Sequence, residues 1–221
     1  MIASTKTYLT RTQKKKIERF RDYLKVWKRG RKRTFPWRKN PTPYDILIAE
    51  FFLQRTKALQ AERQYKEFMK EYPSFRKLSI VKRGDVSKYM IPLGLKKRVP
   101  MMIGVIKTIS GKYNGRIPTN YEDLVKLTGV GDYTANAVCV FALNESAPLI
   151  DANTIKVFSQ LFNKKISREE GKRSKFVRAC AEYFSSLGNP RLWNWVLLDF
   201  GAEGSVDGFL KHRKDKRSKI H

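Results

Sequence analysis

The chain has 221 residues, and its 47 Lys and Arg against 20 Asp and Glu give a formal net charge of +27. This excess points to a polyanionic partner. The sequence has no apolar run of the ~20 residues that a membrane-spanning helix needs, and residues 1–6 form no apolar signal core. Its two cysteines, Cys139 and Cys180, are too far apart for a zinc or iron–sulfur motif. We therefore expect an intracellular protein without a membrane role or a metal site.

The first third of the chain predicts helices with a basic start. Between residues 1 and 33 there are 13 Lys or Arg and two acids. The apolar residues from Ile17 to Trp27 follow helical spacing, so we expect an amphipathic helix whose basic face is either solvated or turned to DNA. Proline-rich segments follow at 35–38 and 41–44. Asp45 is expected to cap a helix that runs to Thr56, with further helices at 59–69, 75–78, 85–90 and 99–110.

The most informative stretch is Leu-Thr-Gly-Val-Gly-Asp-Tyr-Thr-Ala at 127–135. We expect a helix at 121–127 and an alanine-rich helix at 133–143, because Gly129 and Gly131 break the pattern between them. Two glycines just before a helix N-terminus leave backbone N–H groups that can hold a phosphate. The same glycines are also consistent with an ordinary turn between two packed helices.

The rest of the chain continues the helical pattern. Helices are expected at 153–161, 168–187 and 190–200, whereas the apolar run at 148–150 is too short to imply a sheet. No alternating strand pattern repeats, so the predicted class is all-α. The last stretch, 211–221, has six Lys or Arg and one acid, and we expect it to be a disordered tail.

Three segments, in this order, resemble the helix-hairpin-helix DNA glycosylases. The first is Phe-Pro-Trp-Arg at 35–38 followed by Pro-Tyr-Asp-Ile-Leu-Ile-Ala-Glu-Phe-Phe-Leu-Gln-Arg-Thr at 43–56. The second is the glycine segment at 127–135, and the third is Leu-Ile-Asp-Ala-Asn at 149–153. Within this superfamily the chain looks most like the branch that holds the adenine glycosylase MutY and the archaeal thymine-DNA mismatch glycosylases. The thymine mismatch enzymes look nearest.

The resemblance implies a two-lobed, all-α architecture. A six-helix barrel containing the hairpin would span 35–143, and a second helical lobe would combine 1–34 with 144–210. Relatives commonly follow Leu-Asp-Phe-Gly-Ala with four cysteines that hold an iron–sulfur cluster, but here 198–202 is followed by Glu-Gly-Ser-Val-Asp. We therefore expect no cluster and no other cofactor, apart from a monovalent cation at the hairpin. Packing is then expected to hold the second lobe, with Trp193, Trp195 and Phe200 as its anchors.

Two carboxylates are the predicted catalytic groups. Breaking an N-glycosidic bond develops positive charge on the sugar, and a nearby carboxylate stabilises that charge or helps to activate water. The resemblance gives this task to Asp151, which would otherwise be a plain helix N-cap. It gives Glu50 the task of protonating or orienting the base, or of positioning water. The alternative for Glu50 is a side chain partly exposed at the edge of its helix, on one stripe with Gln54 and Lys57.

Tyr133 decides the reaction type under this resemblance. Relatives that also cut the DNA strand carry a lysine at this position, and its amine forms a Schiff base with the sugar. A tyrosine cannot do so, and we predict a monofunctional glycosylase that leaves an abasic site. The simpler role for Tyr133 is packing at the start of a helix.

The remaining predicted site residues would contact DNA. Gln54 and Arg55 match residues that fill the gap left by an extruded base, and arginine pairs well with guanine edges. A surface phosphate contact is the alternative for Arg55. Asn153 is expected to contact the flipped nucleotide or to hold Asp151. The hairpin is expected to bind the DNA backbone through Gly129, Val130, Gly131 and Thr134.

Together these residues predict a monomeric base-excision repair enzyme that acts on double-stranded DNA with a mispaired or damaged base. It would remove thymine or uracil opposite guanine. The second interpretation is an adenine glycosylase that acts opposite 8-oxoguanine. MutY-type enzymes usually carry an extra C-terminal domain, for which this chain has no room. The third interpretation is an inactive DNA-binding protein. The presence of Asp151, Glu50 and Asn153 together argues against it.

Overall fold

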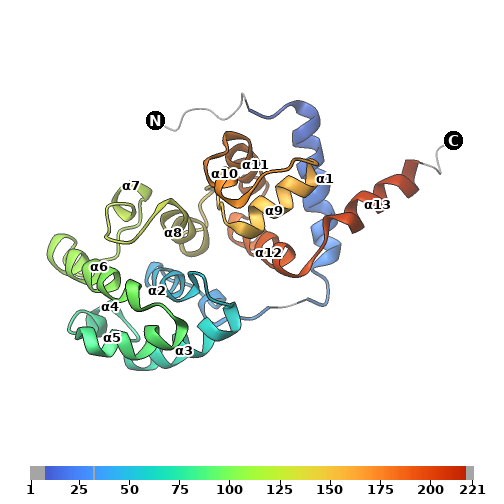
Figure 1. Ribbon diagram of the computed structural model, residues 1–221. Coiled ribbons are helices and arrows are strands. Elements are labelled where there is room, and N and C mark those ends of the chain that lie inside the picture. The colour runs from blue at the N-terminus through green and yellow to red at the C-terminus, as the bar shows by residue number, and fades with distance from the viewer. Residues whose placement is uncertain (1–7, 32, 218–221) are drawn as a thin grey trace. The chain divides into compact units, whose positions relative to one another are not determined.

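The computed structural model describes residues 8–31 and 33–217, with side chains described as far as residue 211. All regular secondary structure in these ranges is helical, which confirms the all-α class, and 148–150 forms no strand there. The chain divides into two compact units. We call Thr34–Asn144 the hairpin unit, and Met1–Arg33 together with Glu145–His221 the terminal unit. Figure 1 shows the helices of both units.

The hairpin unit is built around one buried helix, α2. Its elements are η2 (Pro36–Arg38), α2 (Pro43–Leu53), α3 (Ala58–Glu71), α4 (Phe75–Leu78), α5 (Arg83–Met90), η3 (Ile91–Leu93), η4 (Lys96–Arg98), α6 (Val99–Lys112), α7 (Tyr121–Leu124), α8 (Asp132–Ala137) and η5 (Val138–Ala142). Buried residues occupy every side of α2, and a helix that is apolar all round belongs inside its domain. Accordingly, α2 packs against α3, α8 and η5.

The start of α2 differs from the sequence prediction. Thr42, not Asp45, is the N-cap, and the two residues form a capping box. Thr42 Oγ1 accepts the Asp45 N–H at 3.2 Å, and Asp45 Oδ2 accepts the Thr42 N–H at 2.8 Å. The prediction was wrong because both residues are good N-caps, and Pro43 is well suited to the first helical position that follows Thr42.

The helix after the hairpin is not one continuous α-helix. The sequence predicts a helix over 133–143, but α8 ends at Ala137 and passes into η5, which is a π-helical turn. All residues from 134 to 141 are buried, including Cys139. Such turns admit an extra residue per hydrogen-bonded ring, and here the turn packs against α2.

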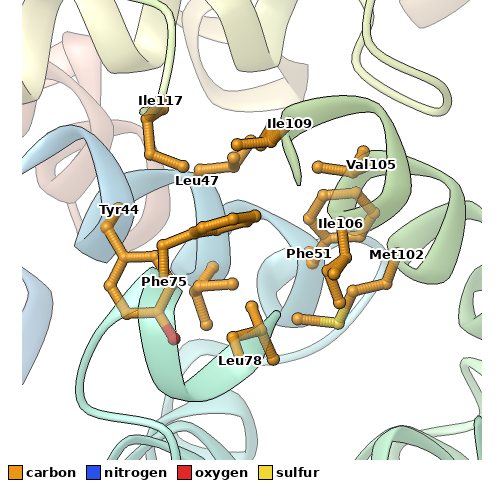
Figure 2. A pocket seen from close by; sticks show the side chains of 11 residues that line it. Tyr44, Leu47, Phe51, Phe75, Leu78, Met102, Val105, Ile106, Ile109 and Ile117 are labelled. Carbon is orange, nitrogen blue, oxygen red and sulfur yellow. The ribbon is translucent and has the colours of Figure 1, made fainter. Parts of the chain in front are cut away.

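A small pocket in the hairpin unit is lined by apolar and aromatic side chains from α2, α4 and α6, and by Ile117 (Figure 2). The one phenol in this lining, Tyr44, donates its hydroxyl to the Tyr72 carbonyl at 2.6 Å. Burial raises the pKa of Tyr44 well above its usual value. Because that hydroxyl is already bonded, the pocket is a packing gap in the core and offers no polar group for reading a base.

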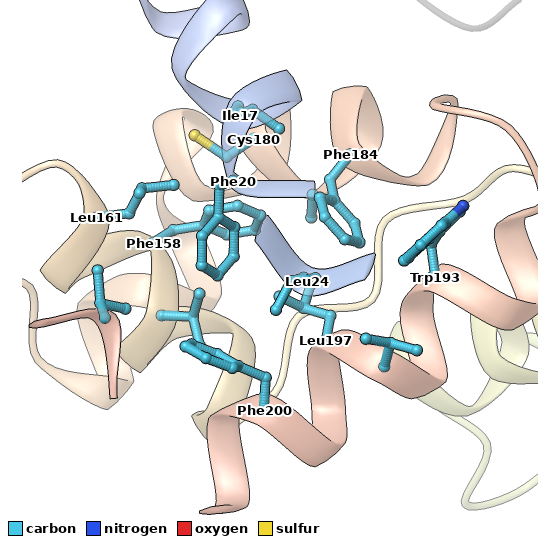
Figure 3. Close-up of a cluster of buried hydrophobic side chains, with 14 of the residues drawn as sticks. Ile17, Phe20, Leu24, Phe158, Leu161, Cys180, Phe184, Trp193, Leu197 and Phe200 are labelled. Carbon is cyan, nitrogen blue, oxygen red and sulfur yellow. The ribbon is translucent and has the colours of Figure 1, made fainter. Parts of the chain in front are cut away.

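The terminal unit joins the N-terminal helix to the C-terminal third of the chain. Its helices are α1 (Arg11–Trp27), α9 (Ala152–Leu161), α10 (Arg168–Arg173), α11 (Lys175–Ser185), α12 (Pro190–Glu203) and α13 (Val206–Arg217). Phe20 and Leu24 of α1 point into a core with Phe158, Phe184 and Phe200 (Figure 3). The predicted amphipathic helix is thus confirmed. Of the predicted anchors, Trp193 and Phe200 are buried and Trp195 is half-buried.

Two predicted segments of the terminal unit differ from the structure. The expected helix at 168–187 breaks at Ser174, which is extended and caps α11 by accepting the Val177 N–H at 3.3 Å. The expected disordered tail at 211–221 is helical as far as Arg217. Val206 and Phe209 are buried, so they dock the start of α13, and the Lys and Arg that follow have high helix propensity. Residues 218–221 lie outside the described residues.

Candidate active site

Asp151 sits at the N-cap of α9 with both carboxylate oxygens bonded. Its Oδ1 accepts the Thr154 N–H at 2.7 Å, and its Oδ2 accepts Asn153 Nδ2 at 3.1 Å. The side chain is half-buried, so the carboxylate is fixed without being sealed from solvent. Asp151 is therefore an N-cap, as the simpler interpretation held, and it is also a carboxylate held in one orientation by two donors. Asn153 was predicted either to contact the flipped nucleotide or to hold Asp151, and its hydrogen bond to Asp151 agrees with the second role.

Glu50 lies on the buried central helix of the hairpin unit. Only 6% of its surface is exposed, so the alternative of a glutamate partly exposed at a helix edge is wrong. Its neighbours along α2, from Ile46 to Phe52, are buried and almost all apolar. A carboxyl group taken this far out of water needs a polar partner or a proton.

Gln54 and Arg55 form the turn that ends α2. Gln54 is extended, with φ −63° and ψ 115°, and the helix ends at Leu53 rather than at the predicted Thr56. The predicted stripe of Glu50, Gln54 and Lys57 is wrong for this reason.

Arg55 has a φ of 57°, in the left-handed region that non-glycine residues seldom adopt, and its side chain is exposed. Gln54 is half-buried, and its Oε1 is buried without a hydrogen-bond partner among the described residues. A strained turn in which an exposed arginine follows a glutamine with an unpartnered amide oxygen is a candidate binding feature.

The two glycines of the hairpin, Gly129 and Gly131, are in different local environments. Gly129 has a φ of 78°, and a Cβ there would lie 2.7 Å from Met101 Cβ, so both the backbone angle and the packing require glycine. Gly131 has φ −99° and is exposed, and a Cβ there would meet nothing within 4 Å. Gly131 therefore leaves open space in front of the first turn of α8.

Two of the residues predicted to bind DNA at the hairpin have buried side chains. The Val130 side chain is buried, and its N–H already donates to the Leu127 carbonyl at 3.0 Å. Thr134 is also buried, with 4% of its surface exposed. Neither side chain is accessible to a ligand. Thr134 could therefore contact DNA only through its backbone N–H group, because the first N–H groups of a helix have no acceptor within the helix. Tyr133 is half-buried in the same turn.

The structure groups the predicted residues in two sets. Asp151 and Asn153 lie together in the terminal unit through their hydrogen bond. In the hairpin unit, Glu50 is on α2, which packs against α8, the helix whose first turn carries Tyr133. Arg55 follows the end of α2 in the same unit.

Sequence reasoning missed the residues that support Asp151. The segment leading into α9 is held where Ser185 Oγ accepts the Ala147 N–H at 3.2 Å and Asn194 Nδ2 at 3.0 Å. Gly201 of α12 lies directly against Asn153. No local pattern reveals these contacts, because each joins parts of the chain that are far apart in sequence.

The cysteines do not fit an iron–sulfur cluster. Such a cluster takes four thiolates, whereas the chain has only Cys139 and Cys180, which are buried, form no disulfide and lie in different units. Among the described residues, no group of three or more His, Cys, Asp or Glu is placed to hold a metal ion. No helix in that part of the chain is long and apolar enough to cross a membrane.

Known proteins resemble this chain along most of its length. The helix-hairpin-helix motif family matches residues 112–141. The thymine-DNA glycosylase of Aeropyrum pernix is 36% identical over 159 residues, which cover 71% of each chain. The thymine/uracil-DNA glycosylase of Methanothermobacter thermautotrophicus is 31% identical over 192 residues, 86% of each chain. The solved structure of a thermostable thymine-DNA glycosylase superposes with a TM-score of 0.77 at 30% identity, covering 86% of this chain and 87% of that one.

Proposed function

This chain belongs to the helix-hairpin-helix DNA glycosylases, and from that membership we propose that it removes thymine or uracil mispaired with guanine from double-stranded DNA. The named activities of the relatives support this substrate class. The observation that carries the chemistry is Asp151, whose carboxylate is held by two donors at the start of α9. A fixed carboxylate is the group that a glycosyl bond cleavage with oxocarbenium character requires.

In the proposed reaction the bond between the sugar C1′ and the base nitrogen breaks, and its electron pair leaves with the base. The Asp151 carboxylate stabilises the positive charge that develops on the sugar. Water then adds its hydroxyl to C1′, and its proton balances the charge on the departing base. The products are the free base and an abasic site in an intact strand.

We propose that Glu50 orients or protonates the departing base, or positions the attacking water. Its burial on α2 supports this role, because a carboxyl group shielded from bulk water can direct a strong hydrogen bond to a bound base or water. The half-buried Tyr133 has no amine, so it cannot form a Schiff base with the sugar. The proposal is therefore a monofunctional enzyme that does not cut the DNA strand.

Base extrusion would use the turn after α2. The exposed Arg55 would enter the stack and hydrogen-bond the orphaned guanine, and the unpartnered Gln54 Oε1 would gain a donor from DNA. The hairpin would hold the DNA backbone through N–H groups at Gly131 and the first turn of α8, and a monovalent cation would bind at the same hairpin. The enzyme would act as a monomer.

A panel of labelled duplexes tests the substrate class. Duplexes with T:G, U:G, A opposite 8-oxoguanine or no mismatch are incubated with the protein, and half of each sample is then treated with alkali. We expect alkali-dependent breaks in the T:G and U:G duplexes. Breaks confined to the adenine strand would instead identify an adenine glycosylase, and tight binding without any breaks would identify an inactive DNA-binding protein.

A further inference from the structure

Helix α12 lies against the first turn of α9, and the contact is made where α12 has no side chain. A Cβ built on Gly201 would lie 2.5 Å from Asn153 Cβ, 3.0 Å from its Cα and 3.1 Å from its carbonyl carbon. Real Cβ atoms essentially never come within 3.0 Å of a heavy atom to which they are not covalently connected. Two of these three neighbours are backbone atoms, so the overlap could not be relieved by turning the end of a flexible side chain.

Gly201 and α9 are tied by a second contact. Lys156 Nζ donates to the Gly201 carbonyl at 3.1 Å. This carbonyl lies in the last turn of α12, where helix carbonyls lack intrahelical partners and a cation is favoured. The two contacts, one at the Gly201 Cα and one at its carbonyl oxygen, fix the last turn of α12 against the N-terminal half of α9.

Asn153 is the link between this contact and the carboxylate. Its Nδ2 donates to Asp151 Oδ2 at 3.1 Å, and the next residue, Thr154, gives its N–H to Asp151 Oδ1 at 2.7 Å. A shift of the Asn153 backbone would therefore disturb both donors that orient Asp151. Gly201 itself is buried, and the three heavy atoms nearest to a Cβ at this position all belong to Asn153.

We propose that Gly201 is a positioning residue for base excision: its missing side chain lets α12 fix Asn153, and thereby Asp151, in the orientation that the reaction needs. This inference rests on the proposed function. It gives the last turn of α12 a role in setting the rate, separate from any role in holding the fold.

The test compares Gly201→Ala with Gly171→Ala. A Cβ at Gly171 would also come within 2.5 Å of α9, but its three nearest neighbours are all side-chain atoms of Ile155. Both variants thus impose a similar overlap on the same helix, and only one presses on the residue that holds Asp151. Single-turnover excision from a T:G duplex is measured at saturating protein, together with affinity for the same duplex and the melting temperature.

We expect Gly201→Ala to lower the single-turnover rate by up to about a hundredfold, since displacements near 1 Å cost that much, while affinity for DNA is retained. Gly171→Ala should keep the rate even if its melting temperature falls. In an Asn153→Ala background, Gly201→Ala should cost less than in the natural chain, because one of the two donors that it disturbs is already absent. Equal rate losses in both glycine variants, or full additivity with Asn153→Ala, would overturn the proposal.

Two further measurements keep the test decisive. If circular dichroism shows that Gly201→Ala does not fold, Lys156→Met loosens the same contact without adding bulk, and it should slow excision while Lys156→Arg restores the rate. An unchanged rate in folded Lys156→Met would then refute the proposal. If the natural chain excises no base, the proposed function fails. The positioning contact is then tested by NMR: the side-chain amide resonance of Asn153 should shift in Gly201→Ala and stay unchanged in Gly171→Ala, and any other result would refute the contact.

Discussion

At the scale of single residues, Asp151 does two tasks that one substitution can separate. Asparagine caps a helix about as well as aspartate, so Asp151→Asn keeps the cap on α9 but removes the negative charge. We expect the excision rate to fall by at least about a hundredfold, comparable to the loss of one group that stabilises transition-state charge. Affinity for a T:G duplex and the urea unfolding midpoint should stay close to those of the natural chain.

The matched variant is Asp151→Ala, which removes both the cap and the charge. It should lose the excision rate and also about 1 kcal/mol of stability. An Asp151→Asn protein that excises thymine at the natural rate would show that Asp151 is only a structural cap.

Cys180 makes stability sensitive to alkaline pH. Burial raises the pKa of the Cys180 thiol from 9.0 to about 12. Above pH 9 the unfolded chain loses this proton while the folded chain keeps it, so the free energy of unfolding falls as the pH rises toward 12. The slope from one such group reaches about 1.4 kcal/mol per pH unit. Urea unfolding between pH 8 and about pH 11 should show a shallower decline in Cys180→Ala, and identical slopes would contradict this account.

At the scale of elements, α13 is held by its aromatic side chain. Phe209 is buried and packs edge-on against Phe20 at 5.4 Å and near Tyr23 at 5.6 Å between ring centroids. We expect Phe209→Ala to lower the free energy of unfolding by about 3 kcal/mol, because a large buried ring is lost. Lys211→Ala, at an exposed position of the same helix, should change it by less than about 0.5 kcal/mol. Equal effects in urea unfolding would mean that α13 is not docked.

Most helices could be predicted because their local signals agree with the packing. The amphipathic pattern from Ile17 to Trp27 and the capping residues found α1 and the region of α2. The π-turn after Ala137 could not be predicted, because an alanine-rich sequence favours a regular α-helix. The feature that goes with the wider turn is its packing against α2, which is distant in sequence. The end of α2 was missed because the left-handed φ of Arg55 has no local signal.

The candidate site was predictable in its residue types but not in its supports. Asp151 and Asn153 were found from their segment, and their hydrogen bond follows from their spacing at a helix start. The burial of Val130 and Thr134 was not foreseen, because residues that flank a glycine turn look the same in sequence whether they face the core or a ligand. The sequence marks Gly201 only as part of the segment that four cysteines follow in relatives, and it gives no sign of the contact between Gly201 and Asn153.

At the scale of the whole molecule, the net charge of +27 governs how tightly the chain holds DNA. Each phosphate that is neutralised releases counterions, so affinity falls steeply as salt is added. We expect the affinity for a T:G duplex to fall by roughly a hundredfold or more between about 50 and 200 mM salt. The preference for T:G over matched DNA should change much less, because base contacts carry it. A salt-independent affinity in a binding titration would contradict an electrostatic DNA surface.

The central claim is that this chain hydrolyses the glycosyl bond of a mispaired pyrimidine through Asp151 and leaves the strand intact. The most direct measurement follows a duplex with a single labelled T:G pair, and scores free thymine, alkali-dependent breaks and borohydride-trapped protein in one time course. The account predicts free thymine in step with alkali-dependent breaks, no trapped protein, and loss of both signals in Asp151→Asn. Breaks without alkali together with a trapped covalent complex, or thymine release that persists in Asp151→Asn, would contradict it.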